Sequence, residues 1–365
     1  MNRYQIAVLP GDFIGPEVVE ASLEVLDEVA RIHGFELAYE RLPFGGGALD
    51  RLGEPLPAET RKAVSECDAV LMGAVGGPQD HPWNRVAREK RVETGILQLR
   101  RHLKVFANLR PVKVFPGLEH LSPLKSEVAA GTDMLILREL TGGIYFGKPS
   151  ANEQDRGVST MVYERFEVER IARVAFESAR TRGGPNGGRV TSVDKANVLD
   201  VSQFWRDVVV GVHQSEFGDV ELDHLYVDNA AMQIVRDPGQ FDVIVTSNLF
   251  GDILSDLAAV IPGSLGLLPS ASLGGAIGLF EPVHGSAPDI AGKGVANPTA
   301  TMLSVAMMLR YGLQQAAAAD DLEAAVQQAL AEDPTKDLGG TRDTASFTAA
   351  VLDVLARRQP VAAPG

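Results

Sequence analysis

The sequence predicts an α/β protein whose sheet is at least partly parallel. Segments with helical spacing alternate with apolar runs of strand length, and the first helix begins near Pro16 and ends at Gly34. This alternation is typical of βαβ units. The chain shows neither an internal repeat nor a linker, which favours domains that share a sheet. The strand-length apolar runs are residues 5–9, 68–72, 134–137 and 241–245.

Local patterns predict the remaining elements. The glycine-rich stretches FGGGALD (residues 44–50) and 183–188 are expected to be loops. The uncharged run 257–280 contains prolines and glycines, which argue against a membrane helix, so we interpret it as a helix end followed by buried turns. We also expect strands at 35–41 and 191–193, a short apolar run that ends at Asp228, and helices at 166–180 and 316–331.

Composition limits the classes of function. A chain of 365 residues can form two domains, and its net charge of −14 argues against binding to nucleic acid or to an anionic membrane surface. Cys67 is the only cysteine, which excludes a disulfide framework and a cysteine zinc site. The N-terminal stretch lacks an apolar signal segment, so we expect a cytoplasmic protein.

The stretch TSNLFGDILSD, residues 246–256, is the strongest candidate for a functional site. It follows a buried strand, and Asp252 and Asp256 are four residues apart on the expected helix, so both carboxylates share one face. Two such carboxylates repel each other unless a proton or cation lies between them, and Mg²⁺ or Mn²⁺ prefers oxygen ligands. An acidic, solvated helix face is the alternative. The position at the carboxyl end of a strand favours a ligand site.

Other polar residues are weaker candidates when each is considered alone. Arg138 follows a buried strand and is a better candidate for binding an anion than Arg100 or Arg110, for which a solvated face is the simpler explanation. Tyr145 lies in a glycine-rich loop, where it is either a half-buried packing residue or a functional side chain. Lys195 follows a strand and is either a surface residue or a catalytic amine. No glycine cluster matches G-x-G-x-x-G between a strand and a helix, so the usual dinucleotide-binding motif is absent. A nucleotide would have to bind through a different structural motif.

Long motifs in a fixed order cover nearly the whole chain: PGDFIGPEV, ETGILQLR, FANLRP, RELTGGIYFG, SVDKANV, YVDNAAM, SNLFGDILSD, LLPSASL and EPVHGSAPDIAGKGVANP. In these motifs the chain resembles the isopropylmalate dehydrogenases, which are metal-dependent β-decarboxylating dehydrogenases. The resemblance implies an α/β fold in which two domains share one large mixed twisted sheet, without a Rossmann site. It also implies an active site in the interdomain cleft, a cofactor-side domain of residues 1–105 plus 263–365, and a substrate and dimerisation domain of residues 106–262.

The resemblance assigns roles to residues of the expected substrate site. The substrate carboxylates would bind Arg100, Arg110 and Arg138, because guanidinium forks pair with carboxylates. Lys195 would be the general base and Tyr145 the acid that protonates the enol after CO₂ leaves. The metal ligands would be Asp252 and Asp256 with Asp228 of the partner subunit, and Lys195 would also reach across a homodimer with shared active sites. The side group of the substrate would contact Glu93, Ile96, Leu97 and Val198.

The same resemblance places the cofactor on the loop that begins at Glu281. His284 would lie against the adenine, and Asp289 would accept a hydrogen bond from the ribose 2′-hydroxyl, which favours NAD over NADP. The other cofactor contacts would be Gly285, Ser286, Ala287, Ile290 and Asn297. Phe13 replaces the middle glycine of the usual GDGIGPE motif. We expect an ordinary backbone there, with the ring altering the packing beside the cofactor pocket, rather than a strained positive φ.

The expected reaction is the NAD- and divalent-metal-dependent oxidative decarboxylation of (2R,3S)-3-isopropylmalate to 4-methyl-2-oxopentanoate, CO₂ and NADH, a step of leucine biosynthesis. Ile96 and Leu97 favour an isopropyl group over the third carboxylate of isocitrate or homoisocitrate. A tartrate or D-malate enzyme of the same fold is the alternative substrate class. A non-catalytic regulatory paralogue is less favoured because the candidate acids and bases are intact, and a magnesium phosphotransferase would lack a P-loop.

Overall fold

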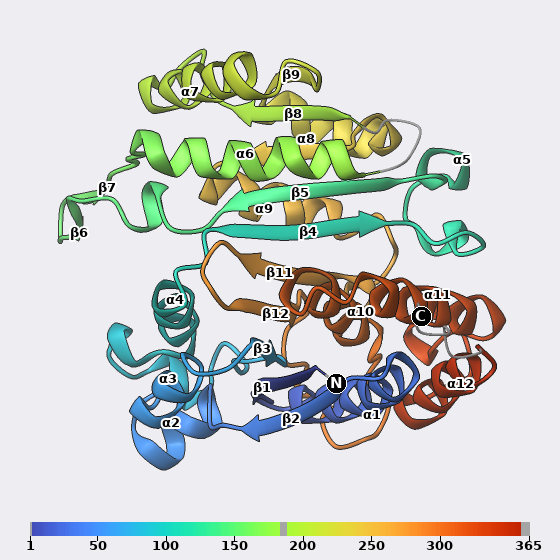
Figure 1. Cartoon of the computed structure of the whole chain (residues 1–365). Helices are drawn as coiled ribbons and strands as arrows, with labels where there is room; N and C mark the ends of the chain where they lie inside the picture. The colour runs from blue at the N-terminus through green and yellow to red at the C-terminus, as the bar shows by residue number, and fades with distance from the viewer. Residues whose placement is uncertain (1, 183–187, 359–365) are drawn as a thin grey trace. The chain divides into compact units, whose positions relative to one another are not determined.

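The computed structural model describes residues 2–182 and 188–358, so the loop expected at 183–188 lies almost wholly outside the described residues. Two compact units divide the chain. The first comprises Met1–Val105 and Ser264–Gly365, and the second comprises Phe106–Gly263. Each unit contributes five strands to mixed sheet structure with helices beside it, and the predicted α/β class is confirmed (Figure 1). The roles assigned above to the two domains stay predictions.

The first unit orders its strands β2-β1-β3-β12-β11. The pairs β2–β1, β1–β3 and β3–β12 are parallel, and β12–β11 is antiparallel. The strands are β1 (Arg3–Leu9), β2 (Glu36–Arg41), β3 (Ala69–Met72), β11 (Pro269–Leu273) and β12 (Gly278–Pro282). The helices are α1 (Gly15–His33), α2 (Gly46–Leu52), α3 (Ala58–Ala63), α4 (Val92–His102), α10 (Thr299–Met307), α11 (Ala316–Glu332) and α12 (Thr344–Ala356).

Helix α1 forms as its sequence predicts. Pro16 lies in the first turn, where a missing N–H is harmless, and Gly34 ends the helix in the left-handed conformation with φ 71°. Its apolar face, which includes Val18, Val25 and Leu26, is fully buried. Because α1 contacts α10, α11 and α12, these four helices form a common core on the sheet of the first unit.

The second unit orders its strands β4-β5-β10-β8-β9, and only the β4–β5 pair is antiparallel. Helices α6 and α7 cover one face of this sheet, and α8 and α9 lie behind it (Figure 1). The strands are β4 (Ala107–Lys113), β5 (Asp133–Glu139), β8 (Arg189–Asp194), β9 (Glu221–Tyr226) and β10 (Val243–Thr246), with a separate pair, β6 (Ser150–Asn152) and β7 (Gly157–Ser159). The helices are α5 (Ser126–Ala129), α6 (Arg165–Thr181), α7 (Asp200–Glu216), α8 (Val227–Arg236) and α9 (Asn248–Ala258).

Two sequence expectations about glycine-rich stretches are wrong. Residues 44–50 are not a plain loop, because α2 begins at Gly46. The buried carboxylate of Asp12 accepts hydrogen bonds from the N–H groups of Gly46 (2.8 Å) and Gly47 (2.9 Å), and these bonds cap a helix that its glycines alone would not favour. The run 257–280 contains the antiparallel pair β11–β12 rather than turns alone. These strands are mostly buried, so they lack the alternation that marks a half-exposed strand.

The backbone at Phe13 also differs from expectation. Its φ is +51°, in the left-handed region that side chains other than glycine rarely adopt. The neighbouring residues are held by backbone bonds from Asp12 N–H to the Ala74 carbonyl (2.7 Å) and from Ile14 N–H to the Ser286 carbonyl (3.1 Å). The Phe13 ring packs against Trp83, with 5.7 Å between ring centroids. Loop closure therefore imposes the strained conformation, and the aromatic contact stabilises it.

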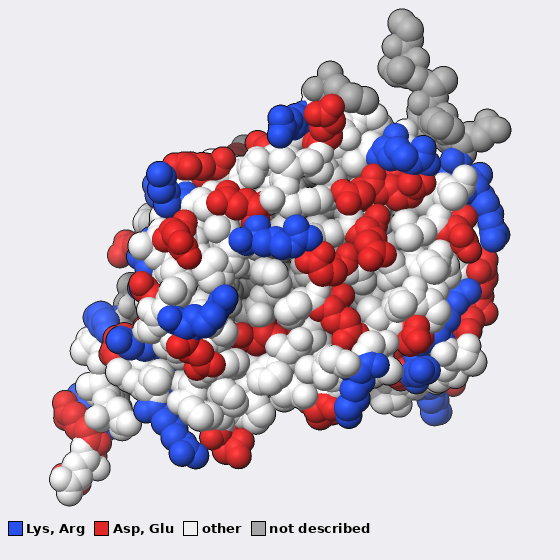
Figure 2. Space-filling model, turned by 90° about the horizontal axis from the view of Figure 1, so that it is seen from below, with Lys and Arg blue, Asp and Glu red and all other residues white. Residues whose placement is uncertain are grey.

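The surface agrees with the charge argument from composition. On the face shown in Figure 2, basic side chains stand singly or in small groups among acidic ones, and no broad basic area appears. Along the part of the chain that the structure describes, no helix combines the length and the apolar character needed to cross a membrane.

Candidate active site

The carboxylates of Asp252 and Asp256 lie on α9, directly after the buried strand β10. Helical geometry places them one turn apart, as the sequence predicts. Helix α9 packs closely on β5, because a Cβ added at Gly251 would come within 2.8 Å of the Arg138 side chain. Glycine at this position therefore lets α9 approach the strand that carries a candidate substrate arginine.

Asp252 connects two of the predicted catalytic and binding residues. Its Oδ1 accepts a hydrogen bond from the guanidinium of Arg138, and its Oδ2 accepts one from the Tyr145 hydroxyl at 2.8 Å. Arg138 is buried on β5 and also donates from Nε to the Asn248 side chain at 3.0 Å. Burial and the adjacent Asp252 carboxylate raise the pKa of Tyr145, so the phenol is held protonated and can donate a proton.

Asp256 has a second arginine as its partner. Arg110, on β4, donates from Nη1 to Asp256 Oδ1 at 3.0 Å and to the Ser255 hydroxyl at 2.9 Å, while its Nε donates to Asn108 at 2.8 Å. The Arg110 side chain is 13% exposed, whereas Asp256 is 70% exposed. Arg110 and Arg138 therefore approach the acid pair from two adjacent antiparallel strands, and the structure brings these four charged residues together.

Lys195 forms a separate pair within the second unit. Its Nζ donates to Asp228 Oδ1 at 2.6 Å, and the ammonium lowers the pKa of Asp228. The preceding Asp194 is buried, accepts from the Ala196 N–H at 2.9 Å and binds Arg206, which fixes the turn that presents Lys195. Val198 follows in the same segment and is 69% exposed.

The chain offers two hard oxygen ligands on one helix face, which suits Mg²⁺ or Mn²⁺. Within the described residues, however, no group of three or more Asp, Glu, His or Cys side chains could hold a metal ion. Asp228 thus does not complete the Asp252 and Asp256 set within a single chain. The two carboxylates fit a divalent ion, and the described residues place no third acidic, His or Cys ligand beside them.

The first unit carries the residues predicted to receive the substrate side group. Glu93, Ile96 and Leu97 lie on α4, with Glu93 exposed and the two apolar side chains half-buried. A cavity of about 560 Å³ is lined by Glu93 and Leu97 together with Gly77, Gln79, Asn84, Arg91 and Thr94. Leu97 therefore gives this cavity an aliphatic side chain, and Ile96 is not among its lining residues.

Arg100, on the last turn of α4, is held by Glu281 at the end of β12. Arg100 Nη2 donates to Glu281 Oε1 at 2.9 Å, and both side chains are largely buried, with exposed fractions of 14% and 9%. Arg100 Nε is buried and has no partner among the described residues. An unsatisfied buried donor of this kind is costly, so it marks a place for an added acceptor such as a carboxylate.

The predicted cofactor loop follows β12 and is irregular. The His284 Nδ1 atom donates to the Gly285 carbonyl at 2.9 Å, and burial lowers the pKa of the imidazole. Its Nε2 atom is buried without a partner in the described part of the chain. Ala287 has a positive φ of 40°. An orphan ring nitrogen beside a strained turn is compatible with a site for a polar cofactor.

The remaining cofactor candidates take different positions in this loop. Ala287 and Ile290 pack against a small core cluster that includes Ile14 and Val18. Asp289 is exposed and Gly285 is open. Asn297 already accepts from the Thr299 N–H at 3.0 Å and donates to Asp337 at 3.1 Å, so only one amide hydrogen is left for a base.

Sequence reasoning missed the role of Asp12. This buried carboxylate binds Gly76 N–H at 2.9 Å as well as the first turn of α2, although burial raises its pKa. The Gly76 carbonyl in turn accepts the Ser286 hydroxyl at 2.7 Å, so Asp12 ties the PGDFIGPE segment to the cofactor loop. The only sign of this role in the sequence was an acid next to Gly11, because the Asp12 partners Gly46 and Gly76 lie 34 and 64 residues away.

Comparisons with known proteins agree with this geometry. The family model described as isocitrate/isopropylmalate dehydrogenase matches residues 5–353. The chain belongs to this family of isocitrate and isopropylmalate dehydrogenases.

Individual proteins of this family are similar to the chain over nearly their whole length. A curated protein from Deinococcus radiodurans named 3-isopropylmalate dehydrogenase is 57% identical over 351 residues, covering 96% of this chain and 97% of its own. One of the same name from Chlorobaculum tepidum is 53% identical over 356 residues, covering 97% and 99%. Among solved structures, isocitrate dehydrogenase from Methylococcus capsulatus matches with a TM-score of 0.82 at 34% identity, covering 97% of this chain and 100% of that one. The family fold expected from the sequence is confirmed.

Proposed function

We propose that the chain is a 3-isopropylmalate dehydrogenase that acts in the cytoplasm, in leucine biosynthesis. The observation that carries the proposal is the arrangement on α9, where each candidate metal ligand is bonded to an arginine that can bind a substrate carboxylate. Arg138 and Arg110 are both mostly buried, where a guanidinium pairs more strongly with a carboxylate than it does in water. The curated relatives above are named 3-isopropylmalate dehydrogenase, which supports this enzyme activity.

The residues of this chain would divide the chemistry as follows. Arg100, Arg110 and Arg138 bind and orient the two carboxylates of the substrate. Lys195, once its amine is neutral, accepts the proton of the 2-hydroxyl group as the C2 hydride leaves, and Tyr145 gives a proton to C3 after CO₂ has departed. Asp194 and Asp252 hold these two groups in place through the bonds described above.

Two bound groups would complete the site. Asp252 and Asp256 would hold Mg²⁺ or Mn²⁺, which when bound polarises the hydroxyl and the ketone it becomes. The loop from Glu281 to Asn297 would hold NAD, which accepts the hydride. Asp289 is exposed on this loop, where its carboxylate can accept from a ribose 2′-hydroxyl but repels a 2′-phosphate. Comparable kcat/KM values for NAD and NADP would refute this part of the proposal.

Substrate choice is tested with a panel of acids. Purified protein with NAD and Mn²⁺ is offered 3-isopropylmalate, isocitrate, homoisocitrate and D-malate in separate assays. NADH formation is followed by its absorbance in the near ultraviolet, and kcat/KM is obtained for each acid. We expect the highest kcat/KM for 3-isopropylmalate, because Leu97 gives this cavity an aliphatic contact for the isopropyl group. Preference for D-malate would identify the alternative substrate class, and no turnover of any acid would favour a regulatory paralogue.

A homodimer with shared sites belongs to the same proposal. Large apolar side chains of the second unit are exposed: Tyr226, Met232 and Val235 at or on α8, Ile253 on α9, and Val198 between β8 and α7. Exposed apolar groups that form one patch commonly mark a protein interface. The pair β6–β7 is a separate two-stranded sheet with mostly exposed residues, and such a pair is only marginally stable alone. A second copy that covers these segments would account for both features.

Sharing of the active sites is tested by mixing two inactive variants. Lys195→Met would remove the base given to the partner subunit, and Tyr145→Phe would remove the acid kept within the chain. In a mixed dimer one site then carries both lesions and the other carries neither. Random exchange makes about half of the dimers mixed, each with one intact site, so roughly a quarter of the wild-type activity should return.

The control for this experiment is subunit exchange measured independently, with tagged chains recovered as mixed dimers. If the dimers mix and activity does not return, each site lies within one chain. Restored activity would also place Asp228 of the partner subunit near the α9 carboxylates, because Asp228 is bonded to Lys195.

A further inference from the structure

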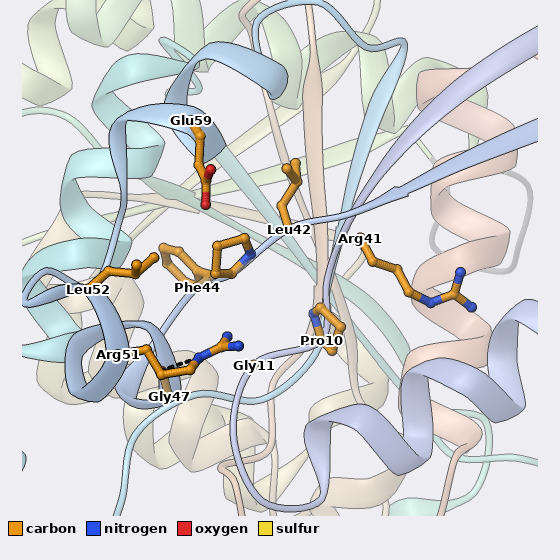
Figure 3. Close-up of a pocket in the computed structure, with 10 residues that line it drawn as sticks. Pro10, Gly11, Arg41, Leu42, Phe44, Gly47, Arg51, Leu52 and Glu59 are labelled. Atoms are coloured by element: carbon orange, nitrogen blue, oxygen red, sulfur yellow. Dashed lines mark hydrogen bonds between the residues drawn. The ribbon is translucent and has the colours of Figure 1, made fainter.

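A surface cavity of about 500 Å³ lies in the first unit, and none of the candidate active-site residues lines it. It lies beside the end of β2 and the helices α2 and α3. Its charged lining residues are Arg41, Arg51 and Glu59, and its main apolar ones are Leu42, Phe44 and Leu52. The volume falls in the range of pockets that bind small molecules. Figure 3 shows Arg51 and Glu59 extending from α2 and α3 toward the space between them.

The charges of this cavity are not neutralised equally. Arg41 is bonded through Nη2 to Glu20 at 2.7 Å, so its charge already has a partner. Arg51 donates only from Nε, to the Gly47 carbonyl at 3.1 Å, which leaves its terminal nitrogens open. Glu59 has no hydrogen bond or ion pair with the described residues, and it forms no ion pair with Arg51. One cation and one anion therefore face the same space without pairing with each other.

This arrangement restricts the ligand chemistry. A ligand with only negative charge would be repelled by Glu59, and one with only positive charge would be repelled by Arg51. A zwitterion can satisfy both groups, with its carboxylate on the guanidinium fork and its ammonium on the carboxylate. Leu42, Phe44 and Leu52 then give an apolar wall for the rest of the molecule.

We propose that this cavity is a binding site for a small α-amino acid with an apolar side chain. Arg51 binds the α-carboxylate, Glu59 binds the α-ammonium group, and the side chain packs on Leu42 and Leu52. None of the residues assigned to substrate, metal or cofactor lines this cavity, although Pro10 and Gly11 of the β1–α1 connection border it beside β2, α2 and α3.

The experiment measures binding by titration calorimetry on the full-length protein, with L-leucine as the probe. Two analogues separate the charges: 4-methylpentanoate lacks the ammonium group, and 3-methylbutylamine lacks the carboxylate. We expect saturable binding of L-leucine at one site per chain. Each analogue should bind at least about tenfold more weakly, because it leaves one charged side chain without its partner.

Variants assign the binding to this cavity. Arg51→Gln and Glu59→Gln should each weaken L-leucine binding about tenfold or more. Glu54→Gln is the matched control, because Glu54 is exposed nearby and does not line the cavity. The binding should persist with saturating 3-isopropylmalate and Mn²⁺ present. The proposal is overturned by absent binding, by equal binding of 4-methylpentanoate, by unaffected variants, or by displacement with 3-isopropylmalate. None of these outcomes depends on catalytic turnover.

Discussion

The left-handed backbone at Phe13 predicts that a glycine variant is more stable than an alanine variant, which is the reverse of the usual order. In an ordinary helix or strand, glycine is less stable than alanine by about 0.5–1 kcal/mol because it loses more conformational freedom. At a φ of +51° the alanine variant keeps the strain of about 1–2 kcal/mol that a Cβ causes, whereas glycine does not. We therefore expect Phe13→Gly to be more stable than Phe13→Ala by about 1 kcal/mol.

Both variants lose the same ring contacts. The Phe13 ring packs on Trp83 at 5.7 Å and on His81 at 6.2 Å between centroids, and it is only partly buried. Loss of these contacts should cost about 2 kcal/mol in Phe13→Ala. Because the loss is common to both variants, it cancels in their difference and leaves the backbone term.

Urea unfolding at one fixed protein concentration measures the difference, since an assembly would make the midpoint depend on concentration. With an m-value of about 3 kcal/mol/M, a difference of about 1 kcal/mol shifts the midpoint by about 0.3 M. The control pair is Glu24→Ala and Glu24→Gly at an exposed position of α1, where the glycine variant should be the less stable by about 1 kcal/mol. If Phe13→Gly unfolded at lower urea than Phe13→Ala, the assignment of backbone strain at Phe13 would be wrong.

Three further predictions concern the proposed metal site, substrate specificity and the single thiol. Asp252→Asn should abolish activity, and added Mn²⁺ should raise the thermal midpoint of the wild type but not that of the variant; equal protection of both would exclude Asp252 as a ligand. Leu97→Ala should lower kcat/KM for 3-isopropylmalate by about 10–200-fold and for D-malate much less; equal losses would mean that Leu97 does not contact the isopropyl group. Cys67 is buried and its pKa is raised to about 11, so it should resist iodoacetamide at neutral pH until the protein is unfolded; rapid labelling of the native protein, followed by mass spectrometry, would contradict this.

The chemistry of α9 could be predicted from the sequence because its determinants are local. The i, i+4 spacing of Asp252 and Asp256 fixes their common face wherever the helix lies. The buried run before it is a strand for the same local reason, since a short apolar segment rich in β-branched residues is favoured in a sheet. The pairing of each arginine with its aspartate could not be predicted from the local sequence. Arg110 lies 146 residues from Asp256 in the sequence, and the pairing of β4 with β5 brings it there.

By itself the sequence determined the elements whose signals lie within one or two turns: α1 with Pro16 and Gly34, the buried strands, and the acid pair. Where the local conformational preference of the sequence is weak or opposes the observed backbone, only the tertiary structure decided the conformation. Helix α2 begins at Gly46 because the distant Asp12 carboxylate accepts its first N–H groups, and Phe13 adopts a positive φ because the residues on both sides are bonded to other segments. The physical reason is common to both cases. A hydrogen bond to a buried group supplies a free energy comparable to a backbone preference, but its partner is far away in the sequence.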